Sequence, residues 1–312
     1  NIMHGQDFFM IDGNYESHDG VTANVVCSVQ RGQPKRLSKN GKRMARISDH
    51  VGSIPLVMIS PRDGELVAGM SEERRRFLDS AISQYDKTYL SSLIRYEAAL
   101  KQRNALMRQE DAEPDWELVS VLEDQMSAEA DVIFSAREAF TREFVPIFRQ
   151  LYAVLCDNAA EASDVGIEYD SHLQRGPLKA QLEAFRAKER IVGHTLHGVH
   201  KDEMQLSLGG YPVRREGSQG QTKTYFIAMK LAQFLFLKEK GERRTPLLLL
   251  DDVFDKLDAG RVGRIVDYVS GEAFGQIFIT DTDRSRLNRL LHATKSDYRL
   301  FLVDNGMVEQ QA

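Results

Sequence analysis

Two adjacent carboxylates follow an uninterrupted apolar run in Leu247-Leu248-Leu249-Leu250-Asp251-Asp252. Such a run is typical of a strand buried inside a parallel sheet, and ligands bind at the carboxyl ends of these strands. In a phosphate-binding ATPase the first acid holds Mg²⁺, usually through water, and the next polarises the attacking water. The sequence therefore predicts Asp251 as the metal acid and Asp252 as the water-orienting acid. The alternative is a buried strand whose polar end turns to solvent.

A serine and a glycine precede a helical stretch, in the segment Ser218-Gln219-Gly220-Gln221 before Thr222–Lys240. The free N–H groups and the hydroxyl at such a helix start suit a phosphate group. The segment therefore predicts nucleotide contacts for Ser218, Gly220 and Gln221. The alternative is a serine-capped helix after a glycine turn.

Two further polar residues, Asp258 and Thr280, follow Asp252 along the chain. Thr280 ends the apolar run Gln276–Thr280, where it can face a terminal phosphate; the alternative for each residue is an ordinary loop position. The spacing from Gln221 to Asp251 allows one helix and one return strand, and that from Asp258 to Thr280 allows another such pair. Taken together, the segments resemble the order of an ABC-type ATPase: signature motif, Walker B acids, D-loop and switch residue.

The elements that must position these residues alternate between strand and helix. The expected strands and the hairpin centre are Phe8–Asp12, Thr22–Gln30, Lys39-Asn40-Gly41-Lys42, Ile54–Ser60, Val165–Tyr169, Gln205–Leu208, Leu247–Leu250, Gln276–Thr280 and an edge strand at Tyr298–Val303. The expected shorter helices are Pro177–Ala187, Thr222–Lys240 and Arg261–Ser270. Strands and helices that alternate in this way favour a parallel-rich sheet of the α/β class.

Between Ser71 and about Asn158 the apolar period is helical. One long helix is expected from Ser71, acting as its cap, through to Leu106, and a second long helix has Pro114 in its first turn. Two long amphipathic helices in succession indicate an antiparallel pair. Because sheet signals flank this stretch on both sides, we expect one sheet domain with a helical domain inserted into it.

The overall composition restricts the class of protein. The 312 residues carry 41 Lys and Arg against 46 Asp and Glu, a net charge of −5, which excludes DNA binding by bulk positive charge but allows a local basic groove. Two cysteines, Cys27 and Cys156, exclude a disulfide scaffold and fit a reducing compartment. The sequence contains no apolar run of 18 residues and no charged-then-apolar leader, so we expect a cytoplasmic protein with no membrane span.

Several stretches together resemble the RecF family of DNA-repair ATPases, which is related to SMC proteins. The RecF-like stretches are Ile59-Ser60-Pro61-Arg62-Asp63-Gly64-Glu65-Leu66-Val67-Ala68-Gly69, Arg74-Arg75-Arg76-Phe77-Leu78-Asp79, Arg103-Asn104-Ala105-Leu106, Gly198-Val199-His200-Lys201-Asp202-Glu203 and Gly217-Ser218-Gln219-Gly220-Gln221. The resemblance implies an α/β fold, an ABC-ATPase-like head of mixed sheet and flanking helices with an inserted helical lobe. The expected division is head at 1–64, lobe at 65–195 and head again at 196–312.

The resemblance also implies a function. A RecF-like protein binds double-stranded DNA as an ATP-dependent homodimer that uses ATP and Mg²⁺, acts with RecO and RecR, and helps to load RecA. In that assembly Ser218 and Gly220 of one subunit contact the terminal phosphate held on the other, where Asp251 and Asp252 act, and Asp258 lies at the dimer seam. The rival interpretation is a non-hydrolysing SMC-like structural head; an ABC transporter ATPase fits less well, because it lacks so long a helical arm.

Two departures from the family pattern affect these expectations. RecF proteins usually carry Gly-Pro-His-Arg-Asp-Asp where this chain has Gly198-Val199-His200-Lys201-Asp202-Glu203, and lysine lacks the bidentate fork of arginine. No G-x-x-x-x-G-K-[S/T] phosphate loop occurs in residues 1–312, and Gly41-Lys42 does not complete one. We therefore expect this chain to be a fragment that lacks the first several dozen residues and binds ATP poorly or not at all.

Basic residues at two places are candidates for DNA contact. Lys39, Lys42 and Arg43 lie at the tip of the expected hairpin, and Arg74 and Arg75 belong to a basic triplet on a helix. The alternative for the triplet is a solvated face paired with Glu72, Glu73 and Asp79. A third pattern, His194-x-x-His197-x-x-His200, is interpreted as ordinary loop or core histidines rather than a zinc site.

Overall fold

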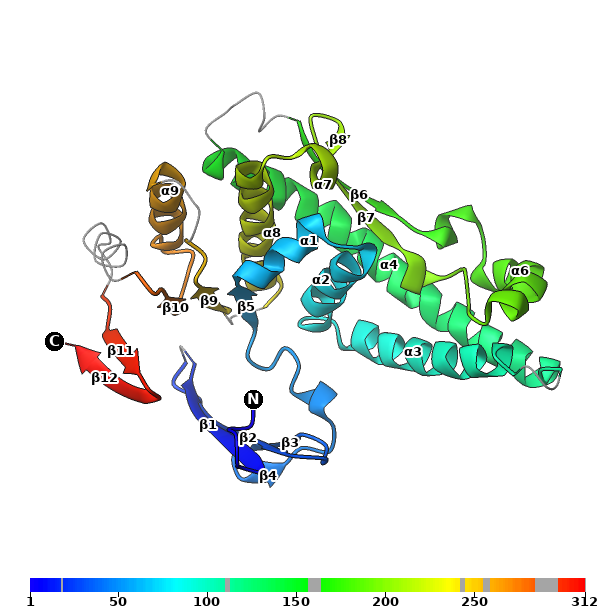
Figure 1. Cartoon of the computed structure of the whole chain (residues 1–312), viewed down its shortest axis with the longest axis horizontal. Helices are drawn as coiled ribbons and strands as arrows, with labels where there is room; N and C mark the ends of the chain where they lie inside the picture. Colours follow the sequence, from blue (N-terminus) through cyan, green and yellow to red (C-terminus); the bar gives the residue numbers. More distant parts are fainter. Residues whose placement is uncertain are drawn as a thin grey trace.

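A computed structural model of the chain describes residues 1–17, 19–109, 113–156, 164–241, 245–254, 259–283 and 297–311. The strands are β1 (Phe8–Glu16), β2 (Thr22–Gln30), β3 (Arg36–Lys39), β4 (Lys42–Arg43), β5 (Leu56–Ile59), β6 (Val165–Asp170), β7 (Glu203–Leu208), β8 (Tyr211–Pro212), β9 (Leu247–Asp251), β10 (Ile277–Thr280), β11 (Leu300–Asp304) and β12 (Met307–Gln311). The α-helices are α1 (Glu65–Ala68), α2 (Ser71–Ser83), α3 (Lys87–Met107), α4 (Trp116–Leu155), α6 (Leu178–Val192), α7 (Val213–Glu216), α8 (Gln219–Lys240) and α9 (Ala259–Val269). Figure 1 shows β1–β5 and β9–β12 towards one end of the long axis and a helical arm extending towards the other.

The first four strands form an antiparallel sheet in the order β1-β2-β3-β4. The β3–β4 turn is the predicted hairpin, with Asn40 and Gly41 at φ values of 51° and 74°. Two successive positive φ values define a two-residue turn whose twist matches the flanking strands, which explains the preference for Asn-Gly there. The predicted hairpin is therefore confirmed.

The central sheet has the order β10-β9-β5, and all three strands are parallel. Its buried side chains include Leu248, Leu250, Val57 and Ile59, which contribute to the main core under α8. The remaining sheets are antiparallel, so the fold is mixed rather than uniformly parallel. The edge strand expected at Tyr298–Val303 forms as β11, which pairs with β12 in a separate two-stranded sheet and does not join the central one.

The long helices α3 and α4 form the predicted antiparallel pair (Figure 1). Arg95 and Arg103 on α3 pair with Glu129 and Glu123 on α4 respectively. The partner number falls as the α3 number rises, which requires opposite helix directions. The arm is therefore held by an exposed ion pair and a buried one as well as by apolar contacts.

The predicted helix starts in this region are wrong in detail. Ser71 is the first residue of α2 rather than its cap, and its hydroxyl donates to Glu203. The helix expected to run on to Leu106 breaks before Lys87, where Asp86 caps α3 by accepting from the Tyr89 N–H. Asp115, rather than Pro114, sets the start of α4, because its carboxylate accepts the N–H groups of the first turn.

One core spans both the arm and the sheets. The second half of α4 carries a row of buried aromatic side chains, two of which contact α8: Phe140 lies 4.8 Å from Phe236 and Phe148 lies 4.8 Å from Tyr225, measured between ring centroids. Helix α4 therefore belongs to the core under α8 at one end and to the arm at the other. In the part of the chain that the structure describes, no helix has both the length and the apolar character needed to cross a bilayer.

Candidate functional site

Asp251 and Thr280 meet at the carboxyl edge of the central sheet. They are paired residues at the ends of β9 and β10, and Thr280 Oγ1 donates to Asp251 Oδ1 over 2.6 Å. Asp251 is half-buried and Thr280 is exposed. Two residues separated by almost thirty positions are thus brought into contact by strand register, and the hydroxyl holds the carboxylate in one orientation.

Asp252 has an unusual backbone. Its φ is 49°, a left-handed value that costs a residue with a Cβ roughly 1 kcal/mol and that Asp and Asn tolerate best. Its N–H donates to the carbonyl of Thr280 over 3.1 Å, and the following Val253 and Phe254 are buried. The surrounding structure therefore fixes a sharp turn that presents a second, half-buried carboxylate next to Asp251.

The chemistry of this edge suits a hard divalent cation. Asp251 and Asp252 supply carboxylate oxygens at the ends of parallel strands, and the Thr280 hydroxyl occupies only one lone pair of Asp251. Mg²⁺ prefers one or two carboxylates together with water and phosphate oxygens. The two acids and Thr280 are therefore the residues here that could hold Mg²⁺ beside a phosphate.

Ser218 caps α8 and is exposed at the surface. Its hydroxyl oxygen accepts from the Gln221 N–H at 3.2 Å, while Gln221 Oε1 accepts from the Ser218 N–H at 2.8 Å. A hydroxyl that accepts in this way can still donate its own proton to an anion. The helix-cap alternative and the phosphate-contact prediction are therefore compatible in one residue.

The position of α8 separates Ser218 from the two acids. Lys230 on α8 lies 3.3 Å from Asp63, and the Asp63 carboxylate accepts the N–H of Ser60, directly after β5. Ile59, the last residue of β5, is in register with Leu250 near the end of β9. Lys230, which contacts the segment just after β5, therefore lies level with the carboxyl ends of the central strands. Ser218 lies about 12 residues before Lys230, or ~18 Å along the helix at 1.5 Å per residue.

The signature segment has a neighbour that sequence reasoning did not single out. Arg261, in the first turn of α9, lies against Gly220: a methyl group placed on Gly220 would be 3.3 Å from Arg261 Cζ and closer still to Nη1. The sequence feature that could have identified Arg261 is its position three residues after Asp258, at the start of the helix that follows the D-loop. Asp258 itself lies outside the described residues.

The two groups of basic residues differ in exposure. Lys39, Lys42 and Arg43 are all exposed on the β3–β4 hairpin. Arg74 is instead buried, with Nε 2.6 Å from Glu203 and Nη1 donating to the carbonyl of Gly69. The structure thus removes Arg74 from the surface available to DNA, because its guanidinium points inward.

The other two arginines of the triplet also have protein partners. Arg75 is half-buried and donates to the Asp202 carbonyl over 2.8 Å. Arg76 is exposed, but pairs with both Glu72 and Glu73. The triplet therefore carries much less free positive charge than the hairpin.

Two of the RecF-like stretches meet through a buried arginine. Arg137 on α4 lies 2.7 Å from Asp79 and 2.7 Å from Asp202, and Asp202 also accepts from Tyr169. Burial raises the pKa of Asp202, with Arg137 acting in the opposite direction. Arg137 and these acids therefore join α4, α2 and the segment before β7, so the residues of these stretches have a structural role in the described part of the chain.

The three histidines contact protein groups rather than one another. His200 Nδ1 lies 2.7 Å from Tyr96 Oη and its Nε2 lies 3.2 Å from the carbonyl of Thr195. Burial lowers the pKa of His200 to about 3, so its imidazole is neutral at physiological pH. His197 packs on the Phe185 ring, and His194 Nδ1 contacts the carbonyl of Val192.

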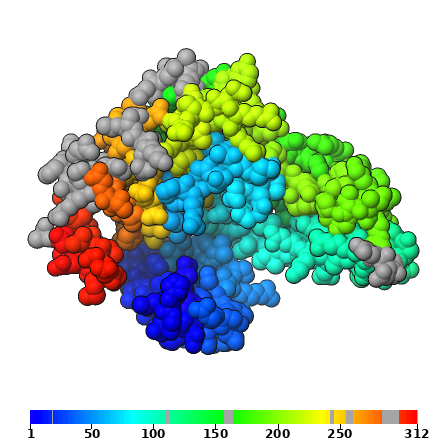
Figure 2. All heavy atoms as spheres, in the orientation of Figure 1, coloured from blue at the N-terminus to red at the C-terminus, as the bar shows by residue number. Residues whose placement is uncertain are grey.

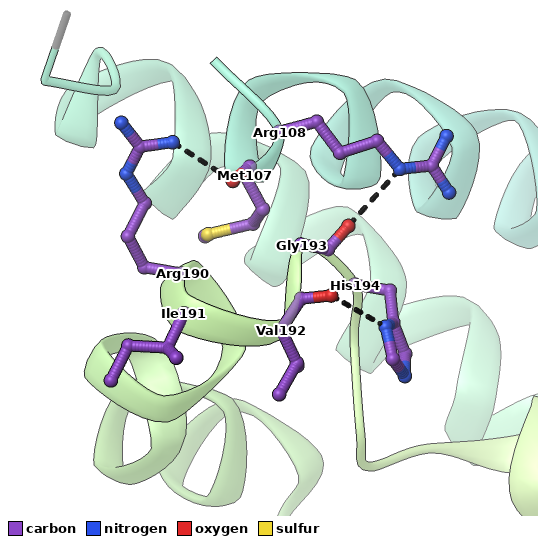
Figure 3. Close-up of a pocket in the computed structure, with 7 residues that line it drawn as sticks. All are labelled: Met107, Arg108, Arg190, Ile191, Val192, Gly193 and His194. Atoms are coloured by element: carbon purple, nitrogen blue, oxygen red, sulfur yellow. Dashed lines mark hydrogen bonds between the residues drawn. The ribbon is translucent and has the colours of Figure 1, made fainter. Parts of the chain in front are cut away.

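A separate hollow lies between the ends of α3 and α6 (Figure 3). These helix ends lie at the far end of the arm from β9 (Figure 1). Arg108 donates to the carbonyl of Gly193 and Arg190 donates to the carbonyl of Met107, so these bonds tie the ends of α3 and α6 together. Ile191 and Val192 line the hollow and are exposed. Figure 2 shows that this end of the arm stands well away from the N-terminal sheet and the β11–β12 hairpin.

Curated relatives match nearly the whole chain. The chain is 50% identical over 310 residues to the DNA replication and repair protein RecF of Bacteroides fragilis, covering 99% of this chain and 82% of that protein. It is 47% identical over 304 residues to RecF of Parabacteroides distasonis, covering 97% of this chain and 81% of that protein. For RecF of Flavobacterium johnsoniae the identity is 42% over 303 residues, with 96% and 83% covered. No protein-family model matches the chain.

Solved structures share the fold. Two structures of the recombination mediator protein RecF in the RecFOR pathway, one described with ATP and one with ATPrS, superpose with TM-scores of 0.84 and 0.82 at 21% and 22% identity. Each alignment covers 99% of this chain and 81% of the other. The Smc head domain with a coiled coil and joint from Pyrococcus yayanosii gives a TM-score of 0.50 at 10% identity, covering 98% and 82%. These similarities confirm the predicted α/β fold, an ABC-ATPase-like head with a helical lobe.

Proposed function

The chain belongs to the RecF family of DNA replication and repair proteins, and from that premise we propose that it forms most of an ATP-dependent DNA clamp. In this proposal two copies close around ATP and Mg²⁺ while bound to double-stranded DNA, and ATP hydrolysis reopens the dimer. The clamp acts with RecO and RecR to load RecA. The described RecF–ATP structure and its RecFOR context support the choice of nucleotide and partners.

The placement of Ser218 is the observation that carries this proposal. Ser218 is exposed, yet it lies ~18 Å along α8 from the level at which the central strands end. A phosphate held at Asp251 is therefore out of reach of Ser218 in the same copy. A second copy, turned to face the first, can supply Ser218 and Gly220 to that phosphate, and two-fold symmetry then completes two equal sites.

Each residue then has a distinct role. Bound Mg²⁺ neutralises charge on the phosphates, and Asp251 and Thr280 are the groups that would hold it. The Asp252 carboxylate accepts a hydrogen bond from water and so orients a lone pair of that water towards the terminal phosphorus. Ser218 of the facing copy donates its hydroxyl proton to a phosphate oxygen, and the Gly220 backbone allows close approach.

Complementation between two inactive variants tests whether sites are shared. Ser218→Asp keeps a good helix cap but places a carboxylate against phosphate, and Asp252→Asn removes the water-orienting acid. We expect each variant to be inactive alone, in protein that includes the phosphate loop the family resemblance implies. When the two variants are mixed in equal amounts, random pairing makes half of the dimers mixed. Each mixed dimer has one intact site out of two, so ATP turnover should return to about a quarter of wild type. ATP turnover measured against mixing ratio checks this, and an inactive mixture contradicts shared sites.

We also propose that the β3–β4 hairpin contacts the DNA backbone. Lys39, Lys42 and Arg43 are exposed cations at a loop tip, where phosphates can be reached with little desolvation. Arg75 makes at most a minor contribution, because its guanidinium is already bonded to the Asp202 carbonyl.

Replacing Lys39, Lys42 and Arg43 together by alanine is expected to weaken binding of duplex DNA about 10- to 100-fold and to reduce the salt slope by about 3. Fluorescence anisotropy of labelled duplex across a salt series, with the ATP-bound protein, measures both quantities. Arg76→Ala is the matched control, since Glu72 and Glu73 already neutralise this exposed arginine. Equal losses of DNA affinity in the two variants would show that the hairpin does not contact the DNA.

We also propose that residues 1–64 and 196–312 form the head, that residues 65–195 form an inserted lobe, and that the protein is cytoplasmic. The shared core along α4 and α8 means that this lobe is not an independent folding unit.

A further inference from the structure

Arg261 fills the space beside the signature glycine. Because Gly220 has no side chain, the Arg261 guanidinium can lie directly over it; a methyl group there would be 3.3 Å from Cζ and 3.5 Å from Nη2. Gly220 lies in the first turn of α8, two residues after Ser218. A permanent positive charge therefore stands within the surface formed by the Ser218 hydroxyl and the Gly220 backbone.

The fold fixes this placement firmly. Helix α9 buries Val262, Ile265 and Val266 in the core. Its other arginine, Arg264, donates to the carbonyl of Leu155 at the end of α4. Arg261 itself is half-buried, so its side chain has little freedom to leave the α8 terminus.

Two further described cations lie on the helix that precedes this end of α8. The preceding α7 contributes exposed Arg214 and Arg215 against a single acid, Glu216. A guanidinium presents five N–H donors in a plane, keeps its charge at every relevant pH and bonds phosphate oxygens in pairs. Such a surface is complementary to a polyphosphate anion.

We propose that Arg261 is a catalytic residue that acts across the dimer, contacting the terminal phosphate of the ATP bound to the facing copy. This inference rests on the proposed function, because only a shared site brings α8 of one copy to the nucleotide of the other. The guanidinium stabilises the charge that develops on the phosphate oxygens as the bond to the leaving phosphate lengthens. No proton or covalent bond passes through Arg261.

Arg261→Gln tests the proposal in protein that includes the phosphate loop the family resemblance implies. Glutamine keeps polarity but removes the charge, so we expect ATP turnover to fall about 100-fold. Arg261→Lys should recover part of this loss, because it restores charge without the planar fork. Arg76→Gln, the same change at an exposed arginine that Glu72 and Glu73 already neutralise, is the matched control and should turn over ATP as wild type does. Wild-type turnover by Arg261→Gln would overturn the proposal.

Mixing distinguishes action across the dimer from action within one copy. Arg261→Gln combined with Asp252→Asn should regain about a quarter of wild-type turnover, because mixed dimers contain one site with intact acids and an intact facing arginine. If this mixture stays inactive while Ser218→Asp and Asp252→Asn complement each other, Arg261 acts within its own copy and the inference fails alone. If neither mixture recovers, the shared-site proposal fails, and this inference with it.

A double-mutant cycle provides an independent check. Gly220→Ala should displace the guanidinium rather than unfold α8, because the atoms in the way are the end of a flexible side chain. Adding Gly220→Ala to Arg261→Gln should therefore lower turnover by less than Gly220→Ala does alone; the loss that remains reflects the methyl group in the space that the facing phosphate approaches. Fully additive losses would overturn the contact as the source of the effect.

Discussion

Asp252→Asn is expected to lower ATP turnover about 1000-fold, in protein that includes the phosphate loop the family resemblance implies, since a positioned general base contributes about 10²- to 10⁴-fold. The amide cannot accept the proton of an attacking water or hold that water by a charged hydrogen bond. Asparagine tolerates left-handed backbone nearly as well as aspartate, so the turn at φ 49° should survive. Steady-state phosphate release, with and without linear double-stranded DNA, measures the loss.

The same variant should still bind ATP although it no longer turns it over. Asp251 and Ser218 remain, so ATP should still drive dimerisation, and the dimer should persist because hydrolysis no longer opens it. Size-exclusion chromatography with light scattering checks this expectation. Asp267→Asn, an exposed acid on α9, is the control for loss of one surface charge and should be indistinguishable from wild type.

Two outcomes would revise the assignment. Unchanged DNA-stimulated turnover in Asp252→Asn would remove Asp252 as the water-orienting acid. A wild-type protein that dimerises with ATP but turns over no faster than Asp252→Asn would favour the rival function, a non-hydrolysing SMC-like head.

Arg103→Met is expected to destabilise the arm by about 3–5 kcal/mol, the cost of leaving buried charges without their partner. Arg103, Glu123 and Glu189 are all fully buried; Arg103 Nη2 lies 2.8 Å from Glu123 and 2.6 Å from Glu189. Its Nη1 also donates to Thr195 Oγ1 over 2.7 Å. One guanidinium therefore joins α3, α4, α6 and the segment that follows α6.

The measurement must detect unfolding of the arm as well as of the whole chain. Urea denaturation gives the free energy of unfolding, and hydrogen exchange of α6 amides reports opening of the arm alone. Arg95→Met is the matched control on the same helix pair: Arg95 is 50% exposed, so its pair with Glu129 is screened by water and should contribute little to stability.

A second variant distinguishes the cost of an unpaired buried charge from the cost of lost packing. Adding Glu189→Met to Arg103→Met should recover part of the loss, because it removes one buried carboxylate left without its partner. If Arg103→Met costs no more than Arg95→Met, the buried network does not hold the arm together.

Local pattern alone predicted several elements closely. The strand expected at Thr22–Gln30 has those bounds in the structure, the Asn40-Gly41 turn forms as predicted, and the apolar run before Asp251 is a buried parallel strand. Each of these depends on periodicity, turn chemistry or an unbroken apolar run within a few residues. The α/β class followed for the same reason, because the alternation of such elements is itself a feature of the sequence.

Other features depended on tertiary contacts between residues far apart in the chain. The contact of Thr280 with Asp251 is set by strand register, and the inward direction of Arg74 is set by Glu203. A sequence shows that a residue is charged but not whether an opposite charge will be packed against it. Arg261 is the clearest case: only the packing of α9 against α8 places its guanidinium on Gly220, and no local pattern carries that information.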